Sequence, residues 1–179
     1  MMLNIFFKLQ FEKKTNIVIN NNIFMKLNYI NFYNKLVELT RNNQLYKNFS
    51  KNDEFSDRLI LLLIHFGFFF KVFKTKNNTK ILQEIYDFVF RQLELSIREI
   101  GYGDQSINKQ MKKYLNLFHS IIDKIHFWEN LKKDEKIDFL NYMLDKSTDN
   151  QHLIDYFEKY KEELQKNNLN SFLKSVNKQ

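Results

Sequence analysis

The sequence of 179 residues contains no cysteine, no proline and only three glycines. The absence of cysteine excludes disulfide bonds, thiolate nucleophiles, Cys-ligated zinc and iron–sulfur clusters, and it is consistent with a reducing compartment. With so few helix-breaking residues, long helices are expected. Apolar residues make up 44% of the chain and aromatic residues 16%, which is enough for one domain with a substantial core.

The net charge is +7, and most of the excess lies near the N-terminus. Residues 1–52 contain eight Lys or Arg and two Glu, whereas the rest of the chain is nearly neutral. A basic segment can bind nucleic acid or an anionic membrane. A chain rich in Lys, Asn, Ile and Phe, without Ala or Pro, is also typical of an AT-rich genome. Net charge alone therefore does not separate a polyanion-binding surface from codon bias.

Residues 1–24 are expected to form a poorly ordered basic arm. Short apolar runs alternate there with charged and Asn-rich stretches. None of these runs reaches the length of a signal peptide, and no small-residue cleavage site follows, so secretion is disfavoured. The low acidic content leaves a mitochondrial presequence open, although Glu12 and the lack of Arg argue against it. Met25 offers an alternative start.

The longest apolar stretch predicts a helix at the centre of a bundle. Residues 59–70 are apolar apart from His65 and Gly67. A membrane-spanning helix needs about 20 such residues, and apolar side chains on every face indicate a helix surrounded by others. Because Gly costs about 1 kcal/mol relative to Ala inside a helix, we expect Gly67 to allow the close approach of a neighbouring helix.

Apolar side chains at three- and four-residue spacing predict further helices on both sides of this segment. We expect one from Met25 onward, two long ones over 80–100 and 107–129, and two more within 131–179, with a fraying end from Lys166. The apolar stripes are Leu27, Ile30, Tyr33, Leu36 (or Val37) and Leu39; Leu82, Ile85, Val89, Leu93 and Ile97, widened by Phe88 and Phe90; Ile107, Met111, Tyr114 (or Leu115), Phe118, Ile121 (or Ile122), Ile125 and Trp128; Ile137, Leu140 and Met143 with Leu144; and Leu153 (or Ile154), Phe157, Tyr160 and Leu164.

The predicted fold class is all-α, because no strand pattern or internal repeat is found. We expect a single-domain helical bundle around the central apolar helix, with extra C-terminal helices. The polar stretch 40–52 is expected to be a loop, with helix-capping oxygens from Ser50 or Asn52 and, later, from Thr148. The expected divisions are a basic arm over 1–24, a helical domain over 25–130 and a C-terminal helical extension over 131–179.

Two of the three glycines lie one residue apart in the sequence Arg98-Glu-Ile-Gly-Tyr-Gly-Asp104, between two predicted helices. Gly101 can take the left-handed conformation that ends a helix, and Gly103 lets the chain turn again. Asp104 and Ser106 then offer side-chain oxygens to the first N–H groups of the next helix. This corner is expected to fix how the two helices meet.

Charged side chains on both sides of the corner allow more than one interpretation. Four residues of alternating sign before it are typical of a solvent-exposed salt-bridge ladder and also of a docking surface. Three lysines after it oppose the dipole of the next helix, which suggests an acidic partner, local compensation by Asp104 or codon bias. The ladder consists of Asp87, Arg91, Glu94 and Arg98, and the lysines are Lys109, Lys112 and Lys113.

No residue pattern indicates an enzyme. The four histidines lack the spacing of zinc sites, and a histidine in an apolar helix, such as His65, is typical of a core residue bonded to a partner. The glycine pair follows a helix and not a strand, so it is no phosphate loop, and Gly-x-Ser-x-Gly and Walker motifs are missing. We predict no catalytic residue, no metal site and no cofactor. The other histidines are His119, His126 and His152.

Three segments carry a specific pattern: 58–65, 85–87 and 98–104. Residues 58–65 resemble the Arg-aromatic-acid-aliphatic-Leu-His helix of the ubiquinol–cytochrome c chaperone family, which assembles the respiratory cytochrome bc complex. Residues 85–87 resemble the family's Leu-Phe-Asp, and residues 98–104 resemble its Arg-Glu-Met-Gly-Val-Gly-Asp. The resemblance covers about 33–128. Ile60 stands where the family has an acid, and His119 where it has Tyr. Further matches at the family's spacing are Phe90, Glu94, Lys109, Met111, Lys112, Lys113 and Phe118.

The resemblance implies a non-catalytic assembly chaperone that binds newly made cytochrome b at the membrane surface. The implied partners are cytochrome b, a small assembly protein, the ribosome and the membrane periphery, and not DNA. The implied location is the cytoplasmic side of the inner membrane or, in mitochondria, its matrix side. The alternative function, kept open by the basic charge, is a helical RNA- or ribosome-binding module.

The resemblance also gives roles to particular residues. The corner and its lysines become candidates for recognition of the client or a partner, because loops set on rigid helices commonly carry binding. Three further residues become candidates for internal polar contacts. The recognition candidates are Arg98, Glu99, Gly101, Tyr102, Gly103, Asp104, Lys109, Lys112 and Lys113, and the internal candidates are Arg58, His65 and Asp87.

Overall fold

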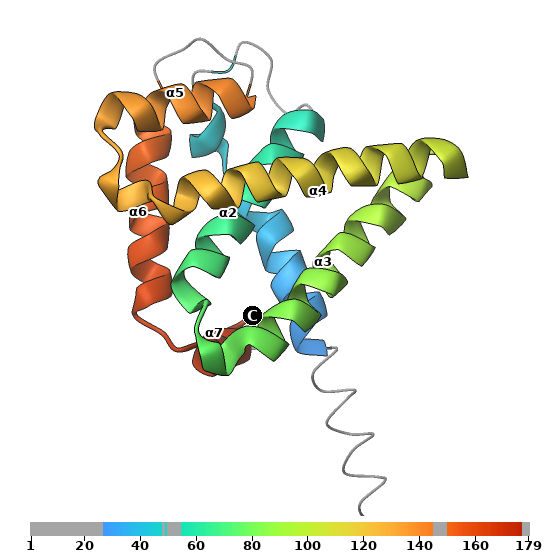
Figure 1. Cartoon of the computed structure of the whole chain (residues 1–179), viewed down its shortest axis with the longest axis horizontal. Helices are drawn as coiled ribbons and strands as arrows, with labels where there is room; N and C mark the ends of the chain where they lie inside the picture. The colour runs from blue at the N-terminus through green and yellow to red at the C-terminus, as the bar shows by residue number, and fades with distance from the viewer. Residues whose placement is uncertain (1–26, 48, 50–54, 145–149, 177–179) are drawn as a thin grey trace, which may run out of the picture.

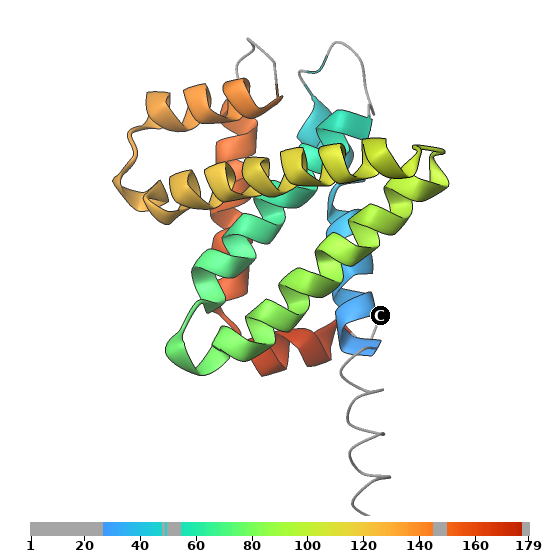
Figure 2. The same ribbon diagram turned by 45° about the vertical axis from the view of Figure 1, so that its right-hand side comes forward.

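The computed structural model describes residues 27–47, 49, 55–144 and 150–176 (Figures 1 and 2). Within these ranges all regular structure is helical and no strand occurs, which confirms the predicted all-α class. Residues 27–39 form the first described helix. The elements that follow are η1 (Asn43–Tyr46), α2 (Phe55–Phe73), η2 (Lys76–Asn78), α3 (Thr79–Glu99), α4 (Asp104–His126), η3 (Trp128–Asn130), α5 (Lys133–Leu144), α6 (Gln151–Gln165) and α7 (Leu169–Ser175).

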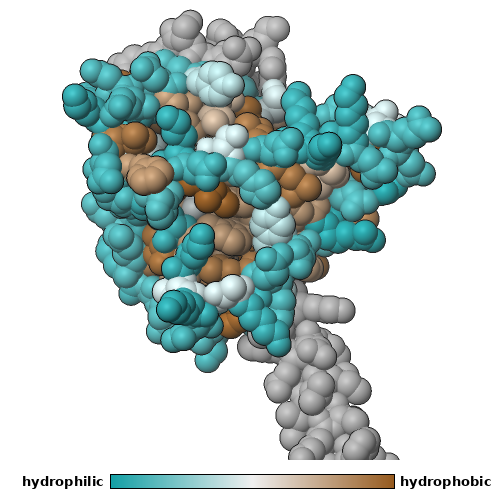
Figure 3. Space-filling view, viewed as in Figure 1, coloured by the Kyte–Doolittle hydropathy of each residue, from teal (hydrophilic) through white to brown (hydrophobic). Residues whose placement is uncertain are grey.

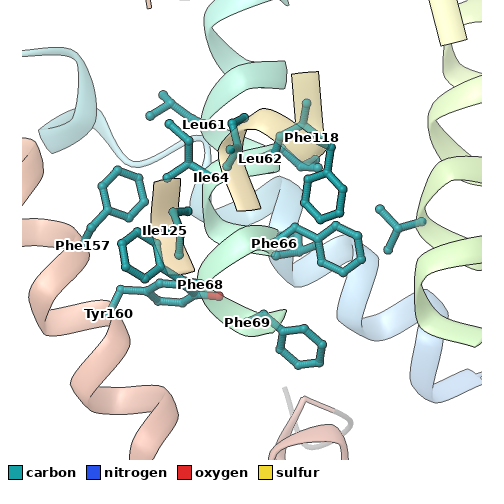
Figure 4. Close-up of a cluster of buried hydrophobic side chains, with 14 of the residues drawn as sticks. Leu61, Leu62, Ile64, Phe66, Phe68, Phe69, Phe118, Ile125, Phe157 and Tyr160 are labelled. Carbon is teal, nitrogen blue, oxygen red and sulfur yellow. The ribbon is translucent and has the colours of Figure 1, made fainter. Parts of the chain in front are cut away.

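Helix α2 lies at the centre of the bundle, as its apolar sequence predicts. Every residue from 61 to 69 is buried. Figure 4 shows Phe118 and Ile125 of α4 and Phe157 of α6 packed around the side chains of α2. Among the described residues, no helix has the length and apolarity that crossing a bilayer requires.

Aromatic rings join α2 to its neighbours. The ring of Phe66 stacks on that of Phe118 in α4, with centroids 5.0 Å apart and planes at 17°. The ring of Phe68 stacks in the same way on that of Phe157 in α6, with centroids 5.4 Å apart and planes at 12°. Aromatic pairs of this kind contribute about 0.5–1.5 kcal/mol beyond the area that they bury. The abundance of Phe therefore serves the packing of α4 and α6 against α2.

The first helix is confirmed, but its predicted buried face is partly wrong. Leu27 and Ile30 are exposed, whereas Tyr29 and Phe32 are buried. The reason is tertiary, because the Tyr29 hydroxyl donates to Glu84 of α3 at 2.8 Å and the Phe32 ring lies 4.4 Å from that of Phe69. The helix therefore packs its aromatic residues against the bundle, and Leu27 and Ile30 face solvent.

The stripes of the two long helices fall where the spacing places them. In α3 all five predicted residues are buried, and in α4 the predicted residues are buried or half-buried. Trp128 is buried as expected, but it lies in η3 because α4 ends at His126. The predicted stripes of α5 and α6 are also buried or half-buried.

The chain after residue 165 departs from the prediction of a fraying end. Helix α7 forms there, with Leu169 and Leu173 buried and the Phe172 ring 5.6 Å from that of Phe73 in α2. Asn168 caps this helix by accepting a hydrogen bond from Ser171 N at 2.8 Å. A seven-residue helix has too few turns for its spacing to stand out in a polar tail, and contacts with α2 stabilise it.

Two smaller expectations have mixed outcomes. The stretch 40–47 is not only a loop, because half of it forms the 3-10 helix η1, whose Leu45 and Tyr46 are buried. The Tyr46 hydroxyl donates to Thr40 O at 2.5 Å, which folds the stretch onto itself. The arm 1–24 and the predicted caps at Ser50, Asn52 and Thr148 lie outside the described residues. The boundary at residue 130 stays a prediction.

Candidate functional site

The corner between α3 and α4, residues 98–104, projects from the body of the molecule (Figures 1 and 2). Gly101 has φ +98°, in the region that favours glycine, and its N–H donates to Arg98 O at 3.0 Å. Gly103 differs, because its φ of −71° and ψ of 156° are extended values that any residue adopts. The predicted role of Gly101 in ending the helix is therefore confirmed, while Gly103 needs no special conformation.

Arg98 ties the two helices together across the corner. Its Nε and Nη2 donate to Glu94 of α3 at 3.1 and 2.8 Å, and its Nη1 donates to Asp104 of α4. The expected capping by Asp104 or Ser106 is wrong: Gly103 is the N-cap, and no side chain caps this end of α4. The carboxylate of Asp104 makes a charge-assisted bond to the guanidinium instead, which is stronger than a bond to a neutral amide.

Apolar side chains are exposed at the corner. Ile100 is 56% exposed and Tyr102 is 46% exposed, and Leu95 nearby on α3 is 38% exposed. A Cβ placed on Gly101 or on Gly103 would meet no atom within 4 Å. The corner is therefore an unobstructed tip, with apolar side chains facing solvent.

The three lysines beyond the corner lie on the outward face of α4. Lys109, Lys112 and Lys113 are exposed, whereas Ile107 and Phe118 of the same helix are buried. At 3.6 residues per turn the lysines fall roughly opposite the buried stripe. In the described part of the chain none of them forms an ion pair. Their charge therefore faces solvent.

The charged face of α3 forms the predicted ladder in part. Glu94 pairs with Arg98 at 2.8 Å and with Arg91 at 3.5 Å. Asp87 takes no part in these pairs; it is exposed and accepts a hydrogen bond from Gln83 at 2.9 Å. The structure thus places Asp87 on the surface and not among internal polar contacts, and Glu99 is exposed as well.

His65 makes two internal polar contacts. Its Nδ1 lies 2.7 Å from Leu61 O, and its Nε2 lies 2.9 Å from the Tyr156 hydroxyl. Because a carbonyl oxygen only accepts, Nδ1 carries the proton and Nε2 accepts from Tyr156. Burial lowers the pKa of His65 to about 4 against the opposing effect of the Leu61 bond, so the ring is neutral at pH 7. No sequence signal connects residues 91 positions apart.

Arg58, the remaining internal candidate, lies half-buried in the first turns of α2. It stands seven residues before His65, on the same central helix. The structure does not bring Arg58, His65 and Asp87 together, because Asp87 lies on the exposed side of α3. These three residues do not form a common site.

A groove of about 750 Å³ opens between α2, α3 and α4. Figure 3 shows apolar atoms in a hollow on this face, framed by polar residues. The volume falls within the roughly 300–1,000 Å³ of typical binding sites. The apolar lining is Gly67, Phe70, Leu82, Tyr86, Ile122 and Phe127, and the polar lining is Lys71, Lys74, Thr79, Gln83, His119, Asp123 and His126.

The polar rim of the groove includes two of the histidines considered for metal binding. His119 and His126 lie two turns apart on α4 with Asp123 between them, and all three line the groove. Among the described residues, however, no three His, Cys, Asp or Glu side chains are placed to hold a metal ion. The Lys71 ammonium closes one end by donating to His126 O at 2.8 Å and pairing with Glu129. The groove offers an apolar wall and a charged rim for binding.

A family of known proteins matches the part of the chain that forms these surfaces. Residues 47–125 match the family model described as ubiquinol-cytochrome C chaperone. The resemblance found in the sequence is thereby confirmed for this segment. Searches of curated proteins and of solved structures gave no match. The matching family is one of chaperones and not of enzymes.

The matched segment contains both surfaces described above. It includes α2, α3 and α4 up to Ile125, and with them the corner and most of the groove lining. It begins after residues 33–46, which the sequence resemblance had included, and α5 to α7 lie outside it. Sequence reasoning found the corner through its glycines. It missed the groove, because the lining residues come from three separate helices and share no motif.

Proposed function

We propose that this protein is an assembly chaperone of ubiquinol–cytochrome c reductase, the cytochrome bc complex, and that it binds newly made cytochrome b at the membrane surface. The observation that carries the proposal is the family match over 47–125. Membership in this family implies a role in assembling the complex. The groove, formed by helices of that segment, supplies the proposed binding surface.

The chemistry of the groove suits an unassembled membrane protein. Before assembly, a transmembrane helix of cytochrome b exposes apolar side chains that its final neighbours will cover. A hydrophobic groove between helices can accept such a face, with anchors three or four residues apart. About 750 Å³ accommodates a few side chains, which corresponds to one or two helical turns and not to a whole helix. Phe127, exposed at the edge of the groove, is a proposed contact.

The corner is proposed as a second recognition element, which contacts a partner other than the client that the groove binds. It lies at the junction of α3 and α4, the helices that form two walls of the groove. A role of Arg98, Tyr102, Asp104 and the three lysines in contacting a partner is what the family resemblance implies, and the exposure of this surface supports it. A small partner protein and a location at the inner membrane, facing the cytoplasm or the mitochondrial matrix, belong to the same proposal.

The proposal is tested by capturing the client with a groove variant. Phe127→Ser removes an aromatic side chain at the groove that is 56% exposed, so the fold has little to lose. Tyr142→Ser removes one that is 82% exposed on α5, outside the groove, and serves as the matched control. We expect tagged protein from detergent-solubilised membranes to retain cytochrome b with Tyr142→Ser and to lose most of it with Phe127→Ser. Equal capture by both variants would contradict the assignment of the groove.

The second candidate function is an RNA- or ribosome-binding module. The observation that favours it is the group of exposed lysines on the outward face of α4, together with the basic N-terminal charge. Binding of ribosomal RNA that weakens steeply with salt, in proportion to the lysines removed, would support it. A flat response to salt would count against it.

A further inference from the structure

We propose that the corner and the adjoining outward face of α4 dock on an anionic lipid bilayer. In this arrangement Ile100 and Tyr102 enter the headgroup region, and Lys109, Lys112 and Lys113 lie against anionic headgroups. The inference rests on the proposed function, which places the protein at a membrane, and it names the residues that make the contact. The cytochrome b surface is the groove and is separate from this one.

The first observation is the pair of exposed apolar side chains at the tip. Ile100 and Tyr102 have about half of their surface in water although neither is needed to cover the core. Tyrosine is enriched at membrane interfaces, because its ring is apolar while its hydroxyl stays hydrated. An isoleucine beside it adds an aliphatic side chain with no polar group. The pair suits the boundary between headgroups and acyl chains.

The second observation is that the tip is held in shape and stands clear of the body. Gly101 takes a left-handed turn, and Arg98 clamps Glu94 and Asp104 across the corner. Figures 1 and 2 show the tip at the far end of α3 and α4, away from α5 and α6. A preorganised tip loses little conformational freedom on binding. It can reach a flat surface without steric interference from the bundle.

The third observation is the charge around the tip. Of its three acidic residues, Glu94 and Asp104 are paired with Arg98, which leaves Glu99 as the acid without an ion pair among the described residues. Lys109 and the two lysines after it follow on α4, all exposed and within about 14 Å of the start of that helix. Cationic side chains next to inserted apolar ones are typical of peripheral membrane surfaces.

The combination favours a bilayer over a nucleic acid. RNA would attract the lysines and can stack on a tyrosine ring, but it offers nothing to an aliphatic side chain such as Ile100. An anionic bilayer accommodates both the charged and the aliphatic side chains. The groove lies toward the other ends of α3 and α4, about 18 Å or more from the tip along each helix, so the bilayer contact and the groove are separate surfaces.

The test is flotation of the full-length chain with vesicles of phosphatidylcholine, with or without about one third phosphatidylserine, a composition that gives an appreciable surface potential. We expect binding to the anionic vesicles only. Ile100→Ser/Tyr102→Ser and Lys109→Gln/Lys112→Gln/Lys113→Gln should each weaken it, the latter by on the order of fivefold per lysine. Tyr142→Ser should bind like the unaltered chain. Thermal melting verifies that each variant is folded.

A second measurement locates the contact without weakening it. Because the chain has no cysteine, Tyr102→Cys provides a unique site for an environment-sensitive fluorophore. Its emission should shift to the blue with anionic vesicles, whereas the same fluorophore at Tyr142→Cys should not respond. No shift at either position, or equal shifts at both, would overturn the proposal.

Capture of cytochrome b in detergent separates this inference from the proposed function. We expect Ile100→Ser/Tyr102→Ser to capture the client normally there, because no bilayer is involved. If this variant instead binds vesicles normally and loses the client, the tip recognises a protein and the inference is wrong. If only the lysine variant loses vesicle binding, and loses ribosomal RNA equally, the surface is a general polyanion site and the inference is also wrong.

Discussion

Ile125 of α4 fills the space that a side chain on Gly67 of α2 would need. A Cβ on Gly67 would lie 2.8 Å from Ile125 Cδ1 and 3.1 Å from Ile121 Cγ2. Both isoleucines are fully buried, so neither moves without disturbing the core. The glycine in the middle of the central helix therefore sets how closely α4 crosses it, and that crossing forms one side of the groove.

The close approach predicts the effect of Gly67→Ala. Overpacking costs about 1–3 kcal/mol, and the better helix propensity of alanine returns up to about 1 kcal/mol. We expect the free energy of unfolding in urea to fall by about 1 kcal/mol. In an Ile125→Val background, which lacks the clashing Cδ1 atom, the same substitution should cost less. An equal cost in both backgrounds would show that this contact is not the reason for the glycine.

The two corner glycines form a matched pair. Gly101→Ala puts a Cβ on a residue with φ +98° and should lower the free energy of unfolding by about 1–2 kcal/mol. Gly103→Ala places a Cβ in open space at φ −71°, so the gain from the entropy of the unfolded chain and the poorer N-capping of alanine should cancel to within about 0.5 kcal/mol. Urea denaturation of the two variants checks this. Similar losses in both would contradict the conformation described for the corner.

Burial of His65 predicts a pH dependence of stability. Its pKa of about 4 in the folded state lies below its ordinary value of 6.5, so between these values the unfolded chain binds a proton that the folded chain does not. The contribution of His65 to the free energy of unfolding is therefore fully present above pH 6.5. It is lost as the pH falls from 6.5 to 4, which lowers the free energy of unfolding by about 3 kcal/mol. His65→Phe removes the titrating group, and its free energy of unfolding should vary less over this window. An unchanged pH dependence would refute the assignment.

Glu158 of α6 joins the turn η3, helix α5 and its own helix. Its Oε1 accepts hydrogen bonds from Trp128 Nε1 at 2.8 Å and from Lys136 at 2.7 Å, and its Oε2 accepts one from Lys161 at 2.7 Å. Burial raises the pKa of Glu158, but these three bonds outweigh it and lower the pKa to about 2. The carboxylate is therefore charged whenever the protein is folded near neutral pH.

Removing this charge predicts a loss of stability. Glu158→Gln should lower the free energy of unfolding at pH 7 by about 1–2 kcal/mol, because two lysines lose an ionised acceptor. The contribution is present above the ordinary carboxyl pKa of 4.5 and is lost as the pH falls toward 2, so the variant and the unaltered chain should converge in acid. Glu162→Gln, on the exposed side of the same helix, is the control and should change little. Equal effects of both variants would count against the network.

Hydrophobic periodicity predicted much of the fold. It failed where a contact between residues far apart in the sequence determines which face of a helix is buried or which bond a side chain makes. The apolar run of α2 predicted the central helix, and glycine chemistry predicted the left-handed turn at Gly101. The face of the first helix was missed because Tyr29 is oriented by Glu84, which is 55 residues away. Asp104 was expected to cap its own helix, but Arg98 lies within reach only after the corner has folded. Contacts of this kind form only in the folded chain and leave no pattern in the local sequence.

The same reasoning applies to the functional surfaces. The corner is a continuous stretch, so its residues were found from sequence alone. The groove depends on the crossing of α4 over Gly67 and on the alignment of α3 beside it. No local pattern marks a side chain such as Phe127 as a groove residue, since it differs from a core phenylalanine only in its exposure after folding.

The central claim is that this protein serves the assembly of the cytochrome bc complex, and the most direct measurement is made in cells that lack it. Native gel electrophoresis of their membranes gives the amounts of assembled cytochrome bc complex and of the other respiratory complexes. The account predicts a marked loss of the cytochrome bc complex, with the others unchanged, and recovery when the unaltered chain is returned but not when Phe127→Ser is. Normal levels of the cytochrome bc complex in those cells would contradict it.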